Sequence, residues 1–319
     1  MRVVIPGGTG FIGGRIAEHL RSHGHEVRVS SRRARPWAGP STDIAVIPVD
    51  WRNQAALDAA VAGTDALVML AAANEIEAAR DPIGAADATA TQCLAWLQAA
   101  QRQGVRRFLY MSTIHVYGRM EGMVVDEEAT PRPVHPYATT HLAAELFVQA
   151  AHRTNQISGT IFRLSNAFGA PLDPAVDRWS LLVNDLARQA VQTGQLKLLT
   201  DGSQSRDFIG LAAVCAAVRM ALEQSERGPE ATVYNLASGQ MTTVYQMACR
   251  IAERAGRLLG AVPGISRTDP EAGRESGLPG RFDISRLLSS GIDVRTDTDR
   301  EIDELLGFCM VHTPQIGRA

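Results

Sequence analysis

Residues 3–14 read VVIPGGTGFIGG, an apolar run that leads directly into a loop rich in glycine. The apolar residues 2–5 predict a buried strand, and apolar positions at three-to-four spacing over 12–23 predict a helix after the loop. In such a unit the glycines permit a tight turn, the close approach of a pyrophosphate and close packing of helix on strand. The pattern therefore favours a dinucleotide-binding loop over a plain glycine-rich turn. Its expected cofactor-binding residues are Gly7, Gly10, Phe11, Ile12 and Gly13.

The first half of the chain continues to alternate between strand-like and helix-like segments. Five more short apolar runs have the composition of parallel strands buried on both faces. They lie at 27–30, 44–49, 66–70, 107–112 and 159–164. Segments with helical periodicity lie between them, at 53–62, 84–103 and 138–154. This alternation predicts an α/β fold, a Rossmann doubly wound parallel sheet with helices on both faces.

From Asn166 onward the regular alternation breaks. Loops rich in Pro and Gly occupy 169–175, 200–206 and 260–281, and helical patterns lie near 179–193, 210–224 and 243–255. We expect a dinucleotide-binding domain over residues 1–168, a smaller C-terminal α/β substrate lobe mainly over 169–319, and segments near 205–240 that return to the first domain. Such a lobe would cover the carboxyl edge of the sheet, where ligands of these sheets bind.

The composition excludes several classes of partner. The 319 residues carry 32 basic and 34 acidic side chains, a formal net charge of -2, so no strongly basic surface is expected for nucleic acid or an anionic membrane. The longest apolar stretch, residues 66–73, is much shorter than the roughly 20 residues of a membrane span, and the N-terminus lacks the layout of a signal peptide. We expect a cytoplasmic protein with a small-molecule partner.

The cysteines give no sign of a metal site. They are far apart in the sequence and show no metal-ligand spacing. We expect four reduced core residues: Cys93, Cys215, Cys249 and Cys309.

The end of the second predicted strand bears on cofactor choice. A carboxylate there accepts hydrogen bonds from the free ribose of NAD, whereas an arginine accommodates the extra phosphate of NADP. This chain has Ser30 and Ser31 followed by Arg32 and Arg33. Hydroxyls and guanidiniums are donors to a phosphate, so Ser31 and Arg32 favour NADP, with NAD as the alternative. A solvated basic turn is the other interpretation of the two arginines.

Two further motifs lie at a strand end and at a helix start. Residues 111–118 read MSTIHVYG, and residues 136–141 read PYATTH. Together with the glycine loop they resemble the extended short-chain dehydrogenase/reductase superfamily, the NAD-dependent epimerase/dehydratase family, whose marks are TGGxGxxG, Ser/Thr-x-x-x-Tyr-Gly and Tyr-x-x-x-Lys. The resemblance covers nearly the whole chain. It implies an NAD(P)-dependent oxidoreductase or epimerase that acts on a nucleotide-activated sugar.

Other residues carry the same resemblance. It implies that Asp50 and Trp51 contact the adenine side of the cofactor and that Ala71 belongs to the cofactor-binding end of strand four. Segments RLSNAFG (163–169), RDFI (206–209) and RFD (281–283) resemble those of nucleotide-sugar enzymes. The residues of these segments that we expect to bind a sugar diphosphate are Asn166, Arg206 and Arg281. The resemblance also implies a homodimer that pairs the helices at 84–103 and 138–154.

The catalytic chemistry needs a phenol that exchanges a proton with a sugar hydroxyl during hydride transfer, and a second hydroxyl beside it. Tyr137 and Thr113 fit these two roles. His115 could act as a second acid or base at a sugar carbon, and a hydrogen-bonded loop histidine is the alternative. The acidic pair that family 4,6-dehydratases carry at this point is absent, which disfavours that reaction.

The chain departs from the family at His141, where the resemblance implies a lysine that binds the nicotinamide ribose and lowers the tyrosine pKa. An imidazole can donate to a ribose hydroxyl, but only an imidazolium would lower the pKa of Tyr137. Three interpretations stay open: a retuned catalyst in which the two groups titrate as a pair, an enzyme that moves protons through other groups, and a regulatory NADP-binding module without turnover. A reductase of a non-nucleotide carbonyl compound is a further alternative.

Overall fold

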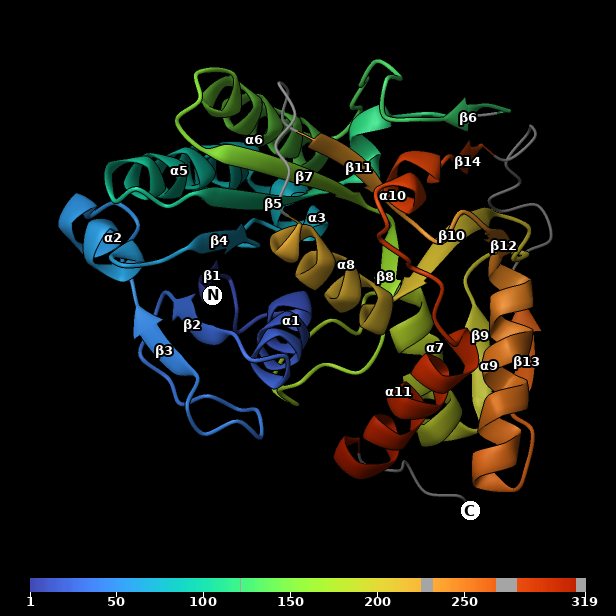
Figure 1. Ribbon diagram of the computed structural model, residues 1–319. Helices are drawn as coiled ribbons and strands as arrows, with labels where there is room; N and C mark the ends of the chain where they lie inside the picture. The colour runs from blue at the N-terminus through green and yellow to red at the C-terminus, as the bar shows by residue number, and fades with distance from the viewer. Residues whose placement is uncertain (121, 225–231, 268–279, 314–319) are drawn as a thin grey trace.

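The computed structural model describes residues 1–120, 122–224, 232–267 and 280–313 (Figure 1). At its centre is a seven-stranded parallel sheet with the strand order β11-β7-β5-β4-β1-β2-β3. In that order the strands are β11 (Thr232–Leu236), β7 (Ser158–Leu164), β5 (Arg107–Thr113), β4 (Ala66–Met69), β1 (Arg2–Pro6), β2 (Glu26–Ser31) and β3 (Ala45–Pro48). All six strands predicted in the first half are present, and the Rossmann fold is confirmed.

Strand β1 lies between β2 and β4. On one side of β1 the chain continues with β2 and β3, and on the other side with β4 and β5, so the strand order reverses at β1. Its side chains alternate between two cores, because successive residues of a strand point to opposite faces. Val3 and Ile5 pack with residues of α1 (Phe11–Ser22) and α8 (Leu211–Glu223). Val4 packs on the opposite face. The loop after β1 therefore opens at the point where doubly wound sheets bind ligands.

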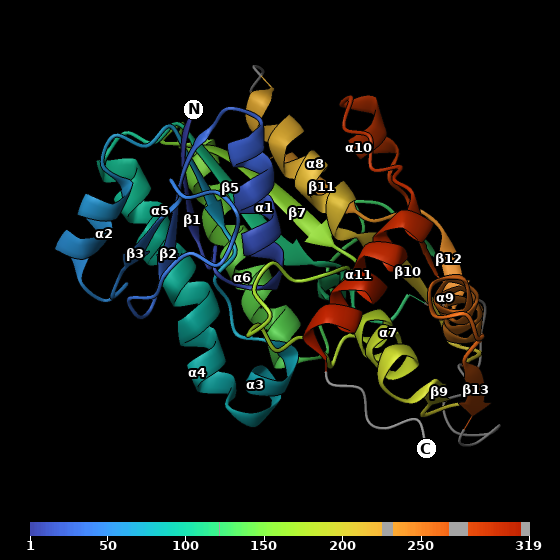
Figure 2. The same cartoon turned by 90° about the horizontal axis from the view of Figure 1, so that it is seen from below.

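Helices cover both faces of the sheet. Helices α1 and α8 lie on one face, and α2 (Gln54–Val61), α5 (Gln92–Arg102) and α6 (Pro136–Arg153) lie on the other (Figures 1 and 2). The helix predicted over 84–103 is built from α4 (Pro82–Ala86), a π-helical turn η1 (Asp87–Thr91) and α5. Thr89 of this wide turn accepts a hydrogen bond from the backbone N–H of Ala73 (3.1 Å), which ties the turn to the chain that follows β4.

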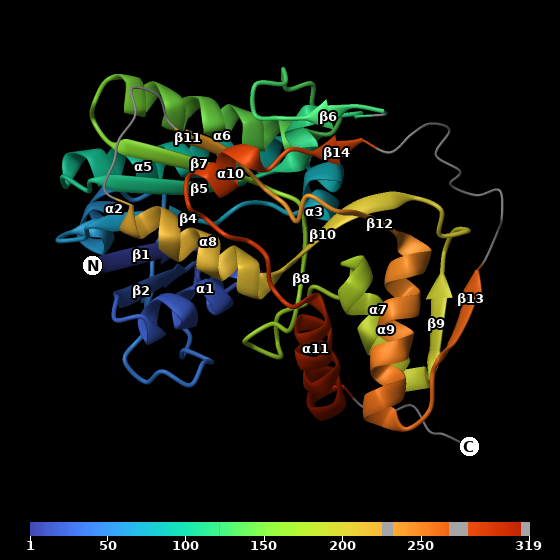
Figure 3. The ribbon, with the colours of Figure 1, turned by 45° about the vertical axis from the view of Figure 1, so that its right-hand side comes forward.

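A smaller lobe follows β7 and has its own core (Figure 3). Its helices are α7 (Leu182–Thr193), α9 (Val244–Leu259) and α11 (Thr298–His312). In its three-stranded sheet, β10 (Ser205–Gly210) pairs with β8 (Asn166–Phe168) and with β12 (Met241–Thr243). In its two-stranded sheet, β9 (Gln195–Leu198) pairs with β13 (Gly264–Arg267). Between these segments the chain returns to the large sheet through α8 and β11. Residues 268–279 of the loop predicted over 260–281 lie outside the described residues.

Short elements surround the carboxyl edge of the large sheet. They are α3 (Glu75–Arg80), the 3-10 helix η2 (Ile114–Tyr117), β6 (Val124–Val125), β14 (Arg281–Phe282) and α10 (Ser285–Ser289). Strand β14 pairs with β6, so the C-terminal part of the chain meets the segment after β5. In the described segments no helix is both long and apolar enough to cross a membrane. Cys93, Cys215 and Cys309 are buried and Cys249 is half-buried, all with free thiols.

Candidate active site

The glycine loop has the geometry of a dinucleotide cradle. Gly7 has a φ of +82°, and a Cβ there would lie 2.7 Å from the backbone N of Ala71. A Cβ at Gly13 would lie 2.4 Å from the carbonyl oxygen of Gly7. At Gly10 the nearest atom is that same oxygen, at 3.2 Å. Gly7 and Gly13 are thus required by the turn and by helix packing, while Gly10 leaves the least obstructed approach, as expected for the pyrophosphate position.

Helix α1 begins directly at this loop. Its N-cap is Gly10, no side chain caps the helix, and its first turn has no acidic residue. The first backbone N–H groups of a helix lack intrahelical partners and stabilise negative charge. Phe11 is 6% exposed and Ile12 packs against the core, so both hold the helix start in place. Together with the glycine cradle, these observations fit the pyrophosphate of a nicotinamide dinucleotide.

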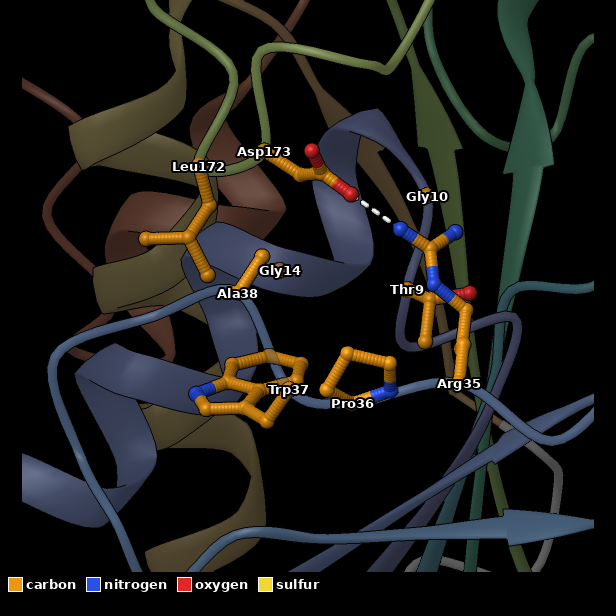
Figure 4. A pocket seen from close by; sticks show the side chains of 9 residues that line it. All are labelled: Thr9, Gly10, Gly14, Arg35, Pro36, Trp37, Ala38, Leu172 and Asp173. Atoms are coloured by element: carbon orange, nitrogen blue, oxygen red, sulfur yellow. Dashed lines mark hydrogen bonds and ion pairs between the residues drawn. The ribbon is translucent and has the colours of Figure 1, made fainter.

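A small pocket adjoins the loop (Figure 4). One side is formed by Thr9, Gly10 and Gly14, and the other by the segment 35–38 with Leu172 and Asp173. An ion pair between Arg35 and Asp173 joins the segment after β2 to the loop that follows β8. No sequence motif marks this contact, which places the smaller lobe beside the glycine loop.

The residues expected to read the adenosine lie at one edge of the sheet. Ser31 pairs in register with Pro48 of β3, so the segments after β2 and β3 leave the sheet together. Arg32 is exposed and forms no ion pair within the described chain. Asp50 is exposed and accepts a hydrogen bond from the backbone N–H of Arg52 (3.0 Å). Trp51 is half-buried, with the Arg52 guanidinium 4.2 Å from the centre of its ring.

Thr113 and Tyr137 meet at the carboxyl end of β5. Thr113 is the last residue of the strand, is 4% exposed and accepts a hydrogen bond from the backbone N–H of His115 (3.2 Å). Burial raises the pKa of Tyr137 above its ordinary value, and a side-chain hydrogen bond with Thr113 opposes that shift. The phenol and the hydroxyl thus lie close together, in the arrangement expected for proton exchange with a substrate hydroxyl.

The start of α6 fixes the position of Tyr137. His135 is the N-cap, and its Nδ1 accepts a hydrogen bond from the backbone N–H of Tyr137 (3.2 Å). Pro136 occupies the first turn, where its missing N–H costs nothing. His135 therefore has a structural role in this site. The Tyr137 ring packs against a cluster of three buried alanines: Ala73, Ala78 and Ala85.

His141 lies one turn after Tyr137 on α6. It is 4% exposed, and its ring centre is 4.6 Å from that of Tyr137 in an edge-to-face arrangement. Nδ1 is 2.7 Å from the hydroxyl of Tyr110, while Nε2 is buried and has no hydrogen-bond partner within the described chain. A buried polar atom without a hydrogen-bond partner in the protein is suited to bind a ligand, so Nε2 of His141 fits a hydroxyl of the cofactor.

Burial, and to a smaller extent the positive charge on protonated His115, lower the pKa of His141 to about 3. The imidazole is therefore neutral at physiological pH. Of the three interpretations that the sequence left open, the pair of phenolate and imidazolium is disfavoured, because burial opposes a charge on the ring and no carboxylate of the described residues raises its pKa. His141 can act at neutral pH only as a hydrogen-bonding group.

His115 lies on η2 at the mouth of the site. Its side chain is exposed, and its ring centre is 6.3 Å from that of Tyr137. Although the residue is exposed, the protein around its ring removes enough water to lower the pKa of His115; the Glu75 carboxylate opposes that shift and the Arg206 guanidinium adds to it. A neutral histidine beside the phenol can accept a proton. Glu75 also pairs with Arg178 (3.9 Å), which joins α3 to the loop before α7 across the site.

The three predicted substrate ligands come from two small sheets. Asn166 pairs in register with Phe208, two residues after Arg206, so both belong to adjacent strands. The Asn166 amide donates one hydrogen bond to the carbonyl oxygen of Asp207 (2.8 Å), so part of its donor capacity serves the sheet. Arg206 is exposed beside His115. Arg281 is exposed on β14, and no direct contact joins it to Arg206 within the described residues.

Sequence patterns missed three residues of this region. In the sequence, Tyr110 has the pattern of an ordinary buried strand residue. Glu75 and Arg178 lie in segments without a motif. Only their tertiary neighbours, His141 and Tyr137, reveal them. In the part of the chain that the structure describes, no group of three or more His, Cys, Asp or Glu could hold a metal ion.

Comparisons with known proteins find relatives over most of the chain. The Low-salt glycan biosynthesis protein Agl12 of Haloferax volcanii is 27% identical over 287 residues, 86% of this chain and 88% of that protein. The dTDP-glucose 4,6-dehydratase of Streptomyces niveus is 29% identical over 278 residues, 80% of this chain and 78% of that protein.

Solved structures share the fold. The UDP-glucose 4-epimerase of Thermus thermophilus in complex with NAD has a TM-score of 0.80 at 23% identity, covering 97% of this chain and 99% of that one. RMD from Pseudomonas aeruginosa complexed with NADPH has a TM-score of 0.78 at 24% identity, covering 98% and 99%. The family described as "NAD dependent epimerase/dehydratase family" matches residues 3–237. The chain, with its glycine cradle and its Thr113–Tyr137 contact, belongs to the NAD dependent epimerase/dehydratase family.

Proposed function

We propose that this protein is an NAD(P)-dependent oxidoreductase or epimerase that acts on a nucleotide-activated sugar. The observation that carries the proposal is the contact between Thr113 and Tyr137 beside an unpartnered His141 Nε2, at the same sheet edge as the glycine cradle. Curated relatives of similar length include the dTDP-glucose 4,6-dehydratase, which supports a nucleotide sugar as substrate.

Each part of the site has a defined task in this proposal. The backbone around Gly7, Gly10 and Gly13 and the start of α1 bind the pyrophosphate, with Ala71 behind it. Ser31, Arg32, Asp50 and Trp51 bind the adenosine half. The bound cofactor supplies the group that accepts or donates a hydride. Tyr137 takes the proton from a sugar hydroxyl or returns it, and Thr113 holds that phenol in place through their hydrogen bond.

The substrate is bound from the other side of the site. Arg206 and Arg281 supply cations for the sugar diphosphate, and Asn166 supplies its remaining amide donor. His115 is the candidate second acid or base at a sugar carbon, since it is neutral and close to the phenol. Ile114 and His115 occupy the position of the dehydratase acidic pair, which favours epimerisation or reduction over 4,6-dehydration.

Two other functions compete with this proposal. A regulatory NADP-binding module would not need the Thr113–Tyr137 contact, and a reductase of a non-nucleotide carbonyl compound would not need Arg206 and Arg281.

We also propose a homodimer that pairs α5 and α6. Its support is the exposure of two large apolar residues on α6, Leu146 (54%) and Phe147 (37%).

Binding of nucleotide sugars tests the proposed substrate class. The protein should bind UDP-glucose or dTDP-glucose in calorimetric titrations with the dinucleotide present. Arg206→Ala should weaken that binding by about 10-fold or more, because it removes charge-assisted hydrogen bonds to the diphosphate. Arg257→Ala, which removes an exposed cation from α9, is the matched control and should have no effect. If the dinucleotide binds while no nucleotide sugar does, the substrate class is wrong.

The choice of cofactor depends on Arg32. We expect NADPH to bind about tenfold more tightly than NADH, because an exposed guanidinium without an ion pair can bind the extra phosphate. Arg32→Ala should remove most of this preference and leave the affinity for NADH unchanged, as measured by calorimetry. Tighter binding of NADH to the unmodified protein would show that Arg32 and Arg33 are a solvated turn.

A further inference from the structure

We infer that Tyr110 is a positioning residue for His141, whose ring packs against Tyr137: the Tyr110 hydroxyl donates to Nδ1 and so fixes the neutral tautomer that carries its proton on Nε2. The inference rests on the proposed function, because Nε2–H is then the donor for a hydroxyl of the nicotinamide ribose. In this way two uncharged residues, Tyr110 and His141, together perform the ribose-binding task of the lysine that the family resemblance implies.

The surroundings of Tyr110 decide the direction of the hydrogen bond. Tyr110 lies in the middle of β5, is 1% exposed and packs in the core between the sheet and α6. Its hydroxyl is 2.7 Å from Nδ1 of His141 and has no other hydrogen-bond partner within the described segments. Burial raises the pKa of Tyr110 well above its ordinary value, so the phenol keeps its proton. A buried O–H group with one neighbour has to donate to it or remain unpaired.

The tautomer of His141 follows from this direction. If Nδ1 carried the proton, Nδ1–H would donate to the phenol oxygen, and the phenol O–H would be left without an acceptor in the core. If the phenol donates, Nδ1 is the acceptor and the ring proton resides on Nε2. When the Tyr110 phenol donates to Nδ1, every polar atom of Tyr110 and His141 is paired except Nε2. Nε2 is also the atom that has no partner in the described chain.

The closeness of the His141 and Tyr137 rings gives this proton a use. The His141 ring is 4.6 Å from that of Tyr137, and both belong to the first two turns of α6. A donor held there can bind a ribose hydroxyl of a cofactor whose nicotinamide lies against Tyr137. Because the tautomer is set by a residue of β5, the rigid sheet orients the donor before any ligand arrives.

Nitrogen-15 NMR of the histidine rings tests the inference on the protein without cofactor. The His141 signals, assigned by their loss in His141→Gln, should show the Nε2–H tautomer in the unmodified protein. Tyr110→Phe should abolish this uniform tautomer. A spectrum of the unmodified protein with the proton on Nδ1 overturns the inference, and this measurement needs no variant of Tyr110.

Cofactor binding supplies a second readout. Tyr110→Phe should weaken NADPH or NADH binding by about 3–10-fold, the effect of one hydrogen bond, and leave binding of the adenosine half, tested with ADP, unchanged. Tyr117→Phe is the matched control, because it removes another buried phenol hydroxyl, which donates to Asn235 (2.6 Å) and does not contact His141. Equal dinucleotide affinity in Tyr110→Phe and Tyr117→Phe overturns the inference. Failure of the unmodified protein to bind any dinucleotide instead contradicts the proposed function.

Discussion

Replacing Tyr137 by phenylalanine is expected to lower kcat by about 10²–10⁴-fold, because the variant loses the group that exchanges a proton with the substrate. The phenyl ring fills the same space among the alanines that surround Tyr137, so the fold and the dinucleotide affinity should be preserved. Steady-state rates with the nucleotide sugar that the protein binds, compared with Tyr117→Phe, measure the effect. Equal rates in the unmodified protein and in Tyr137→Phe would exclude this phenol from the chemistry.

The pH dependence of the same reaction gives an independent check on Tyr137. Burial holds the pKa of the phenol above its ordinary value, and His141, with a pKa of about 3, is already neutral and does not change its charge at neutral or alkaline pH. In the direction in which the phenolate is the base, log kcat/KM should rise by about one per pH unit through the neutral range and show no alkaline fall. His141→Lys places a cation beside the phenol and should move this rise to lower pH. A bell with an alkaline limb that disappears in His141→Lys would contradict a neutral His141.

Replacing Glu145 by glutamine is expected to lower the free energy of unfolding by about 3–5 kcal/mol, the usual cost of removing one partner from a buried ion pair. Glu145 is 0% exposed and Arg163 is 3% exposed, and their closest contact is 2.8 Å. Burial disfavours the guanidinium, but the Glu145 carboxylate outweighs it and raises the pKa of Arg163 above its ordinary value. A guanidinium is too basic to lose its proton in a protein, so the charge remains when Glu145 is replaced.

Chemical denaturation measures this loss, and a double variant separates its cause. Glu145→Gln with Arg163→Met removes both charges and should be less destabilising than the sum of the two single variants. Glu253→Gln breaks an exposed ion pair on α9 and should leave stability unchanged. A single Glu145→Gln variant as stable as Glu253→Gln would show that the buried pair contributes nothing.

The sequence predicted the parts of the fold that depend on local pattern. Strands buried on both faces form continuous apolar runs, so six of the seven strands of the large sheet were recognised. Strand β11 lacks this signal because it contains Asn235, which is 0% exposed and accepts a hydrogen bond from Tyr117. Helix α11 was also not predicted, although Ile302, Leu305 and Leu306 fill the core of the smaller lobe.

The candidate site was predictable only where a motif marks it. The glycine loop, Thr113 and Tyr137 are separated along the chain, and the fold brings them to one sheet edge because β1 and β5 end there. The state of His141 could not be predicted, because its pKa depends on burial beneath residues from other elements. The partners Tyr110 and Glu145 are likewise ordinary strand and helix residues by pattern, and their roles depend on contacts 31 and 18 positions away.

The most direct test of the central claim is rapid-mixing absorbance of the reduced nicotinamide after the protein, loaded with oxidised NADP or NAD, meets a nucleotide sugar that it binds. The account predicts that the absorbance of the reduced form appears in the unmodified protein, and that its rate falls by about 10²-fold or more in Tyr137→Phe. If both ligands bind together and no reduced nicotinamide forms at any pH, and the reduced cofactor is likewise never oxidised, the protein is a binding module and the proposed chemistry is contradicted.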